Sequence, residues 1–171
     1  MKIYKLCLIL LLAVSFGCKN EAEKHSPGND EDALQQNDSI REPSIAELKK
    51  ELTNKGFEVF DYVDTKTGDT TLMQQYFIAF LKRGPNRSQS KEVADSLQTL
   101  HLAHLGSMYE AGYADISGPF GDDGEIRGIT IYNVPSFQMA DSLANMDPMV
   151  QAGRLVIEIH PWWAAKGFPL R

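Results

Sequence analysis

The stretch Tyr76-Phe77-Ile78-Ala79-Phe80-Leu81 decides the fold, because both of its alternating sets of side chains are apolar. Successive side chains of a β-strand point to opposite faces of the sheet, so a strand with two apolar faces needs cover on both. The segment 71–81 is therefore predicted to be a central strand. Gly84-Pro85-Asn86 follows it, a combination of residue types that ends strands.

Downstream of this strand, the apolar spacing alternates between the periods of helices and strands. Helices are predicted at 90–111 and 136–146, and strands at 113–118, 126–134 and 155–160. The order from residue 72 is strand, helix, strand, strand, helix, strand, which predicts an α+β fold, a ferredoxin-like βαββαβ sandwich with both helices on one sheet face. The other face would be bare, so a partner sheet or the N-terminal hairpin must cover it, and a homodimer with face-to-face sheets is the simplest solution.

Upstream of the strand, residues 44–73 predict an extension made of a helix and a β-hairpin. Ser44 is a candidate N-cap with Glu47 at the capping-box position, and Gly56 ends the helix. Residues 57–63 alternate as a strand, and the turn residues of 64–70 lead into the central strand. Residues 166–171 form a C-terminal tail.

The N-terminus has the pattern of a signal peptide over residues 1–17, with two lysines followed by a short apolar run. Its end, Val14-Ser15-Phe16-Gly17-Cys18, resembles the bacterial lipoprotein signal, which implies that Cys18 is lipidated and becomes the first mature residue. An ordinary signal peptide with an incidental cysteine is the alternative. Residues 18–43 are then a disordered tether, since they contain few large apolar side chains. We expect a cell-envelope protein held by its lipid anchor, in the outer membrane because Lys19 is not the aspartate of inner-membrane retention.

Charge and cysteine content exclude several partners. The 171 residues contain 17 Lys and Arg against 23 Asp and Glu, a net charge of -6, with no dense basic run for a nucleic acid. Cys7 and Cys18 are the only cysteines, so the rest of the chain forms no disulfide and no thiolate metal site. Because of its acidic charge, the chain is not expected to bind nucleic acid.

The histidines are the candidate acid/base or metal-binding residues of the predicted domain. His101 lies one helical turn from Leu97 and from Leu105, inside the apolar stripe of its helix, where a histidine is either a core residue or a partly desolvated acid/base. His104 follows three residues later, and His160 is a possible third ligand of a metal. Because no paired carboxylate motif accompanies them, we predict no metal and no cofactor.

The chain resembles the YciI-like (YCII-related) family from Tyr76 to about Trp163, and the predicted domain is residues 74–165. The resemblance rests on the order and spacing of these segments: His101-Leu102-x-x-Leu105, Gly112, Ser117-Gly118-Pro119, Arg127-Gly128, Met146-Asp147-Pro148-Met149-Val150, Ala152-Gly153 and Pro161-Trp162. It implies a dimeric α/β-barrel protein of the ferredoxin-like type, with His101 and Asp147 as a catalytic pair. Members often carry an arginine three residues before the histidine, where this chain has Gln98.

The expected function is that of a small-molecule acid/base enzyme of the isomerase, lyase or lactone-hydrolase type, because a carboxylate that holds an imidazole makes a usable base. His104, Ser117 and Arg127 are candidate ligand-binding residues, and no Gly-x-Ser-x-Gly nucleophile is present. Local sequence allows other interpretations: Asp147 as a helix terminator and Arg127 as a surface charge. The alternative function is a non-catalytic ligand-binding or assembly module on the same fold.

Overall fold

The computed structural model describes residues 41–170. Its helices are α1 (Ile45–Asn54), α2 (Lys91–Glu110), α3 (Phe137–Asn145) and α4 (Pro148–Gln151), and its strands are β1 (Val59–Val63), β2 (Thr70–Arg83), β3 (Ala114–Pro119), β4 (Ile126–Tyr132) and β5 (Leu155–Ala165). The predicted signal peptide, Cys18 and the tether up to residue 40 lie outside the described residues. Within the described part, no helix combines the length and the apolar character that a membrane span requires.

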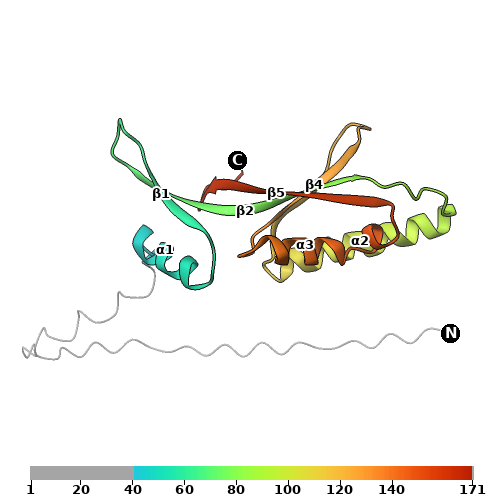
Figure 1. The fold of residues 1–171 in the computed structure, drawn as a ribbon, viewed down its shortest axis with the longest axis horizontal. Coiled ribbons are helices and arrows are strands. Elements are labelled where there is room, and N and C mark those ends of the chain that lie inside the picture. The colour runs from blue at the N-terminus through green and yellow to red at the C-terminus, as the bar shows by residue number, and fades with distance from the viewer. Residues whose placement is uncertain (1–40, 171) are drawn as a thin grey trace, which may run out of the picture. The chain divides into compact units, whose positions relative to one another are not determined.

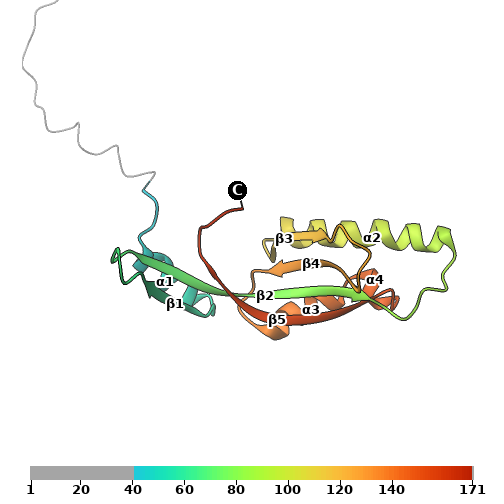
Figure 2. The same ribbon diagram turned by 90° about the horizontal axis from the view of Figure 1, so that it is seen from above.

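The strands form one antiparallel sheet centred on β2, as the two apolar faces of 76–81 predict. β4 pairs with one edge of β2 and β5 with the other, and β3 pairs with the outer edge of β4. β1 pairs with the beginning of β2. Figure 2 shows β3, β4, β2 and β5 side by side in this order. The predicted α+β class is confirmed.

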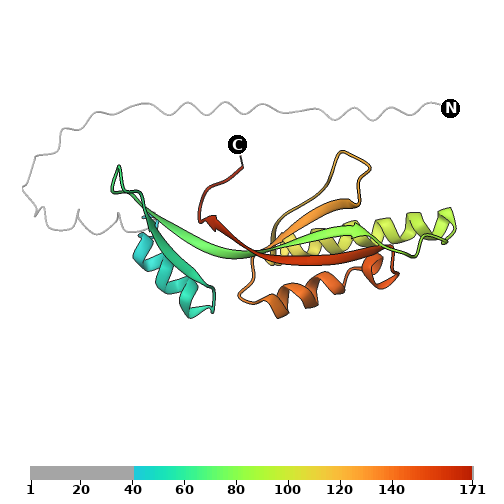
Figure 3. The same ribbon diagram turned by 45° about the horizontal axis from the view of Figure 1, so that its top comes forward.

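The main core lies between the sheet and its helices. Figures 1 and 3 show α2 and α3 on the same side of β2 and β5. Phe77 and Ala79 of β2 pack there with Met108 of α2 and Ala140 of α3. Removing these apolar side chains from water is the dominant favourable contribution to folding.

The opposite face of the sheet carries apolar side chains on β2, beside an ion pair between Lys82 and Glu158, and it is incompletely covered. Ile78 and Phe80 of β2 point away from the core residues Phe77 and Ala79 by strand alternation, and both are half-buried. On β5 they pair with His160 and Glu158, and the exposed Val156 pairs with Lys82 further along the same face. Among residues 41–170, no helix lies on this side of β2 and β5 (Figure 1).

The N-terminal extension begins with a complete capping box. The Ser44 hydroxyl accepts a hydrogen bond from the Glu47 N–H, and the Glu47 carboxylate accepts one from the Ser44 N–H at 2.8 Å. β1 and β2 then form a hairpin whose turn includes Gly68 at a φ of 78°. The domain boundary predicted between residues 73 and 74 falls inside β2.

Two elements differ from their predicted extents. β5 continues past His160 to Ala165, because the 14-residue β2 supplies pairing partners as far as Met73. Pro161 is tolerated because β5 is an edge strand. After α3, the short helix α4 begins where the sequence predicts only a helix end: Pro148 at its first position has no N–H to satisfy, and Asp147 caps it.

Candidate functional site

His101 is held in the interior by α2. This helix of 20 residues is capped by Ser90, whose hydroxyl accepts a hydrogen bond from the Val93 N–H. His101 and Met108 are its buried residues, and His101 has an exposed fraction of 8%. Leu97, one turn earlier, packs against a second small core cluster, so the apolar stripe orients the imidazole inward.

Asp147 reaches the His101 ring from a position 46 residues further along the chain. Its Oδ1 accepts a hydrogen bond from the Met149 N–H at 2.8 Å, which caps α4. Its Oδ2 lies 2.5 Å from His101 Nδ1. The carboxylate has an exposed fraction of only 2%, so both oxygens are fixed by protein donors rather than by water. The structure thus brings together the two residues predicted as a catalytic pair.

This contact determines the chemical state of the two ring nitrogens. A carboxylate can only accept hydrogen bonds, so the proton of the shared bond belongs to Nδ1. In the neutral ring, Nε2 then carries the lone pair, and the contact that the described residues give the ring is the one at Nδ1. Burial, followed by the negative charge of Asp147, raises the pKa of Tyr132, which keeps this neighbouring phenol protonated.

A cavity of about 350 Å³ opens beside the imidazole, between α2 and the β3–β4 edge of the sheet. This volume is at the small end of the range of ligand pockets. Its lining residues come from α2, four strands, α4 and two connecting segments: Leu81, Arg87, Gln98, His101, Leu102, Leu105, Ser117, Gly118, Pro119, Arg127, Gly128, Ile129, Met149, Arg154 and Leu155. A more open hollow of about 800 Å³ beside α1 and β1 has no histidine among its lining residues.

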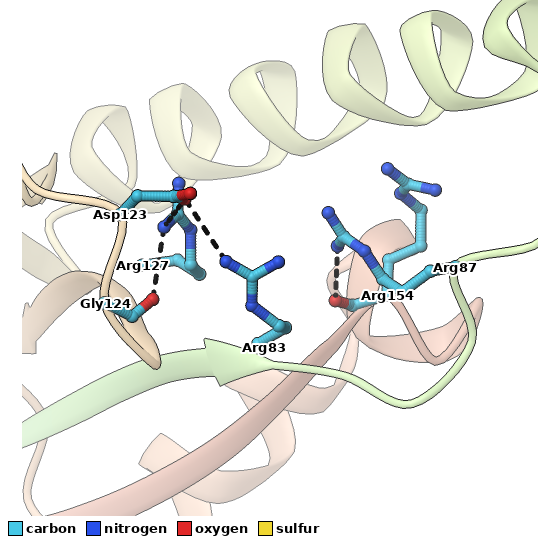
Figure 4. A network of polar contacts seen from close by, with 6 residues as sticks. All are labelled: Arg83, Arg87, Asp123, Gly124, Arg127 and Arg154. Carbon is cyan, nitrogen blue, oxygen red and sulfur yellow. Dashed lines mark hydrogen bonds and ion pairs between the residues drawn. The ribbon is translucent and has the colours of Figure 1, made fainter.

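Arginine side chains gather at this end of the sheet. Figure 4 shows the guanidinium groups of Arg83, Arg87, Arg127 and Arg154 on the same side of the sheet. The Asp123 carboxylate accepts hydrogen bonds from Arg127 at 2.7 Å and from Arg83 at 3.2 Å. Burial, followed by the charges of Arg154, Arg83 and Arg127, lowers the pKa of Arg87. The cluster therefore has an excess of positive charge.

Main-chain contacts hold two of these arginines in place. The segment after β2 lies against the turn before β5, where the Gly84 N–H donates to the Arg154 carbonyl at 2.9 Å and the Asn86 N–H donates to the Gly153 carbonyl at 3.0 Å. A Cβ on Gly84 would lie 2.6 Å from the Arg154 carbonyl carbon, so only glycine allows this approach. The Arg87 guanidinium also donates to the Arg154 carbonyl at 3.2 Å.

Of the remaining predicted residues, the structure places two at the cavity and two away from it. Ser117 and Arg127 line the cavity with His101, and the Ser117 hydroxyl lies 3.0 Å from the Thr130 hydroxyl. His104 is not among the lining residues, and its Nε2 is buried without a hydrogen-bond partner in the described chain. His160 lies on β5 opposite Ile78 and contacts Glu158. Over residues 41–170, no three His, Cys, Asp or Glu side chains are grouped to hold a metal ion.

Sequence reasoning misses Arg87 and Arg154, which line the cavity from connecting segments rather than from helices or strands. Gly84-Pro85-Asn86 marks the first segment as the end of a strand, and Ala152-Gly153, before the second, enters only through the family resemblance. The break after the central strand does not predict the contact between the two segments, because that contact joins positions about 70 residues apart.

The chain is similar to solved structures but matches no family model. No curated protein is significantly similar to it. Among solved structures, it is similar to the 5-chloro-2-hydroxyhydroquinone dehydrochlorinase TftG from Burkholderia phenoliruptrix, in complex with 2,5-dihydroxybenzoquinone. The match has 21% sequence identity and a TM-score of 0.40, and it covers 51% of this chain and 92% of that chain.

Proposed function

We propose that this protein is a small-molecule enzyme that uses His101 and Asp147 for proton transfer. The observation that carries the proposal is the buried contact of 2.5 Å between the His101 ring and the Asp147 carboxylate, at the wall of a cavity. A histidine that only filled the core would not need a fixed carboxylate beside a cavity.

In the proposed reaction, His101 Nε2 takes a proton from a substrate in the cavity, either from a carbon next to a carbonyl group or from an attacking water. The resulting imidazolium carries its new proton on Nε2, and the negative charge of Asp147 stabilises it through Nδ1–H. Return of the proton to another substrate atom gives an isomerisation, and departure of a leaving group gives an elimination. Attack by the activated water would open a lactone. Ser117 and Arg127 line the same cavity and would hold the substrate.

We further propose that the segment from β2 to β5 is a YciI-like domain of the dimeric α/β-barrel type. The element order β2, α2, β3, β4, α3, β5 and the sheet order β3, β4, β2, β5 fit a ferredoxin-like sandwich. A second copy packed face to face would cover the incompletely buried Ile78 and Phe80. Gln98 lines the cavity at the position where the family often has arginine, so positive charge for a substrate must come from elsewhere in this chain.

We propose a cell-envelope location through a lipid on Cys18, in the outer membrane. The support is the signal-like pattern of residues 1–18. Metabolic labelling with a lipid precursor tests it: the wild-type protein incorporates the label, and a Cys18→Ser variant does not. Equal labelling of the variant would contradict the assignment.

The acid/base role is tested with His101→Asn. The side-chain amide of asparagine can still donate to Asp147 but cannot act as a base, so turnover of a panel of lactones and enolisable carbonyl compounds should fall by about 10²-fold or more. Asp95→Asn is a matched change on an exposed position of the same helix, and its turnover should equal that of the wild type. Equal turnover by His101→Asn would contradict the proposal. A wild-type protein that binds panel members in the cavity without converting them would instead be a binding module.

A further inference from the structure

The side chains around the cavity carry an excess of positive charge, which proton transfer by His101 does not require. Arg87, Arg127 and Arg154 line the cavity, and none of the described lining residues is acidic. The Asp123 carboxylate offsets the positive charge of Arg127, but the same carboxylate also pairs with Arg83. Within residues 41–170, neither Arg87 nor Arg154 forms an ion pair with a carboxylate.

The partners of Arg87 and Arg154 are neutral and leave donors unused. Arg154 donates one hydrogen bond to the Gln89 side-chain carbonyl at 2.7 Å, and its Nε is buried without a partner in the described chain. Arg87 donates to the main-chain carbonyl of Arg154. A guanidinium has five N–H donors, and Arg87 is exposed, so water can reach its spare donors. The Arg154 Nε is buried, and buried polar groups are normally paired, so the Arg154 end of the cavity lacks an acceptor.

The two side chains are also held in advance of any ligand. Besides the main-chain contacts of Gly84 and Asn86, the Asn86 and Gln89 side-chain amides both donate to the Ala152 carbonyl, at 3.0 and 3.4 Å. The segment that carries Arg87 is therefore joined to the turn that carries Arg154 by several hydrogen bonds. A preorganised pair of cations loses little conformational entropy when it binds an anion.

We propose that Arg87 and Arg154, with Arg127, form an oxyanion-binding subsite, so that the substrate acted on at His101 carries a carboxylate or a phosphate group. This inference rests on the proposed function for the reaction at His101, but the subsite itself does not. Guanidinium groups suit this ligand because their planar donors match the paired oxygens of carboxylates and phosphates. A bound oxyanion would also offset the mutual repulsion of the arginines.

The test is a calorimetric and NMR titration of the full chain with benzoate and with phenyl phosphate, two probes with the same ring and different oxyanions. The probe that binds more tightly identifies whether the substrate carries a carboxylate or a phosphate group. We expect Arg154→Gln and Arg87→Gln each to weaken that binding about tenfold or more, because each removes a charge-assisted hydrogen bond. Lys66→Gln, which removes the same charge from the exposed β1–β2 turn, should leave the affinity unchanged. Arg154→Lys, which keeps the charge without the fork of donors, should bind with intermediate affinity.

The outcomes separate this inference from the proposed function. Oxyanion binding by His101→Asn at wild-type affinity, together with loss of turnover, supports both. Oxyanion binding by a wild-type protein that converts no substrate supports the subsite and contradicts the enzyme. Absence of binding of either probe at millimolar concentration, or equal affinity in the wild type and in both glutamine variants, overturns the subsite. Denaturant unfolding of each variant shows whether a lost affinity reflects a lost fold.

Discussion

Replacing Asp147 by Asn and by Ala separates its two hydrogen bonds. The Asp147→Asn variant can keep the cap of α4, because an asparagine carbonyl accepts from the Met149 N–H as well as a carboxylate does. Toward His101 it presents an amide that donates, so Nδ1 must become the acceptor and the ring proton must move to Nε2. The fold survives, but the nitrogen that faces the cavity no longer accepts a proton.

The expected losses in the free energy of unfolding follow from the polar groups that each variant leaves without a hydrogen-bond partner. Asp147→Ala loses the cap, worth about 1 kcal/mol, and leaves the buried Nδ1–H of His101 unsatisfied, which costs about 1–3 kcal/mol. The free energy of unfolding should therefore fall by about 2–4 kcal/mol. Asp147→Asn keeps both contacts in neutral form and should cost about 1 kcal/mol. Turnover should fall by about 10²-fold or more in both variants, since both lose the oriented base.

Two measurements check this prediction. Urea unfolding gives the loss of stability, and NMR of the side-chain nitrogens of ¹⁵N-labelled histidine shows which ring nitrogen of His101 carries the proton. We expect Nδ1–H in the wild type and Nε2–H in Asp147→Asn, while the exposed control Asp95→Asn matches the wild type. A His101 proton that stays on Nδ1 in Asp147→Asn, or a loss of stability as large as that of the alanine variant, would refute the reasoning.

Three further substitutions test the structure around the site. Gly84→Ala should lower the free energy of unfolding by about 2–3 kcal/mol, because its Cβ overlaps main-chain atoms. In Gly106→Ala, the new Cβ in α2 meets no atom within 4 Å, so this variant should be more stable than the wild type by about 0.5–1 kcal/mol. A similar urea midpoint for the two variants would contradict the close approach at Gly84. Ser44→Ala should destabilise α1 by about 1 kcal/mol through loss of its cap, measured as faster amide exchange in that helix, and unchanged exchange rates would count against the capping box. Ile78→Glu should convert a wild-type dimer into a folded monomer in light scattering, because it places a charge on the apolar open face; a monomeric wild type would contradict the proposed dimer.

The sequence predicts the elements near the site better than their long-range contacts. The apolar faces of 76–81 indicate the central strand, and the position of His101 between two leucines indicates a ring that faces inward. The extent of β5 cannot be predicted in this way, since its last residues pair only because β2 is long enough to meet them.

The site itself depends on distances that local patterns do not contain. His101 and His104 share one helix three residues apart, and only the packed structure shows which of them meets Asp147 and the cavity. Arg87 follows the break at Gly84-Pro85-Asn86 in the sequence, and its contact with the turn at Arg154 appears only in the structure. Contacts of this kind arise in the tertiary fold, which is why Arg87 and Arg154 are missed although Arg127 and the end of the strand at Gly84-Pro85-Asn86 are predicted.

The most direct test of proton transfer by His101 is hydrogen–deuterium exchange at carbon. Small enolisable carboxylates and phosphates are incubated in D₂O with the wild-type protein and with His101→Asn, and loss of the C–H signal is followed by NMR. The account predicts exchange catalysed by the wild type for at least one compound, at a rate that falls to the protein-free background in the variant. Equal exchange rates with the two proteins, or no exchange with the wild type for any compound of the panel, would contradict it.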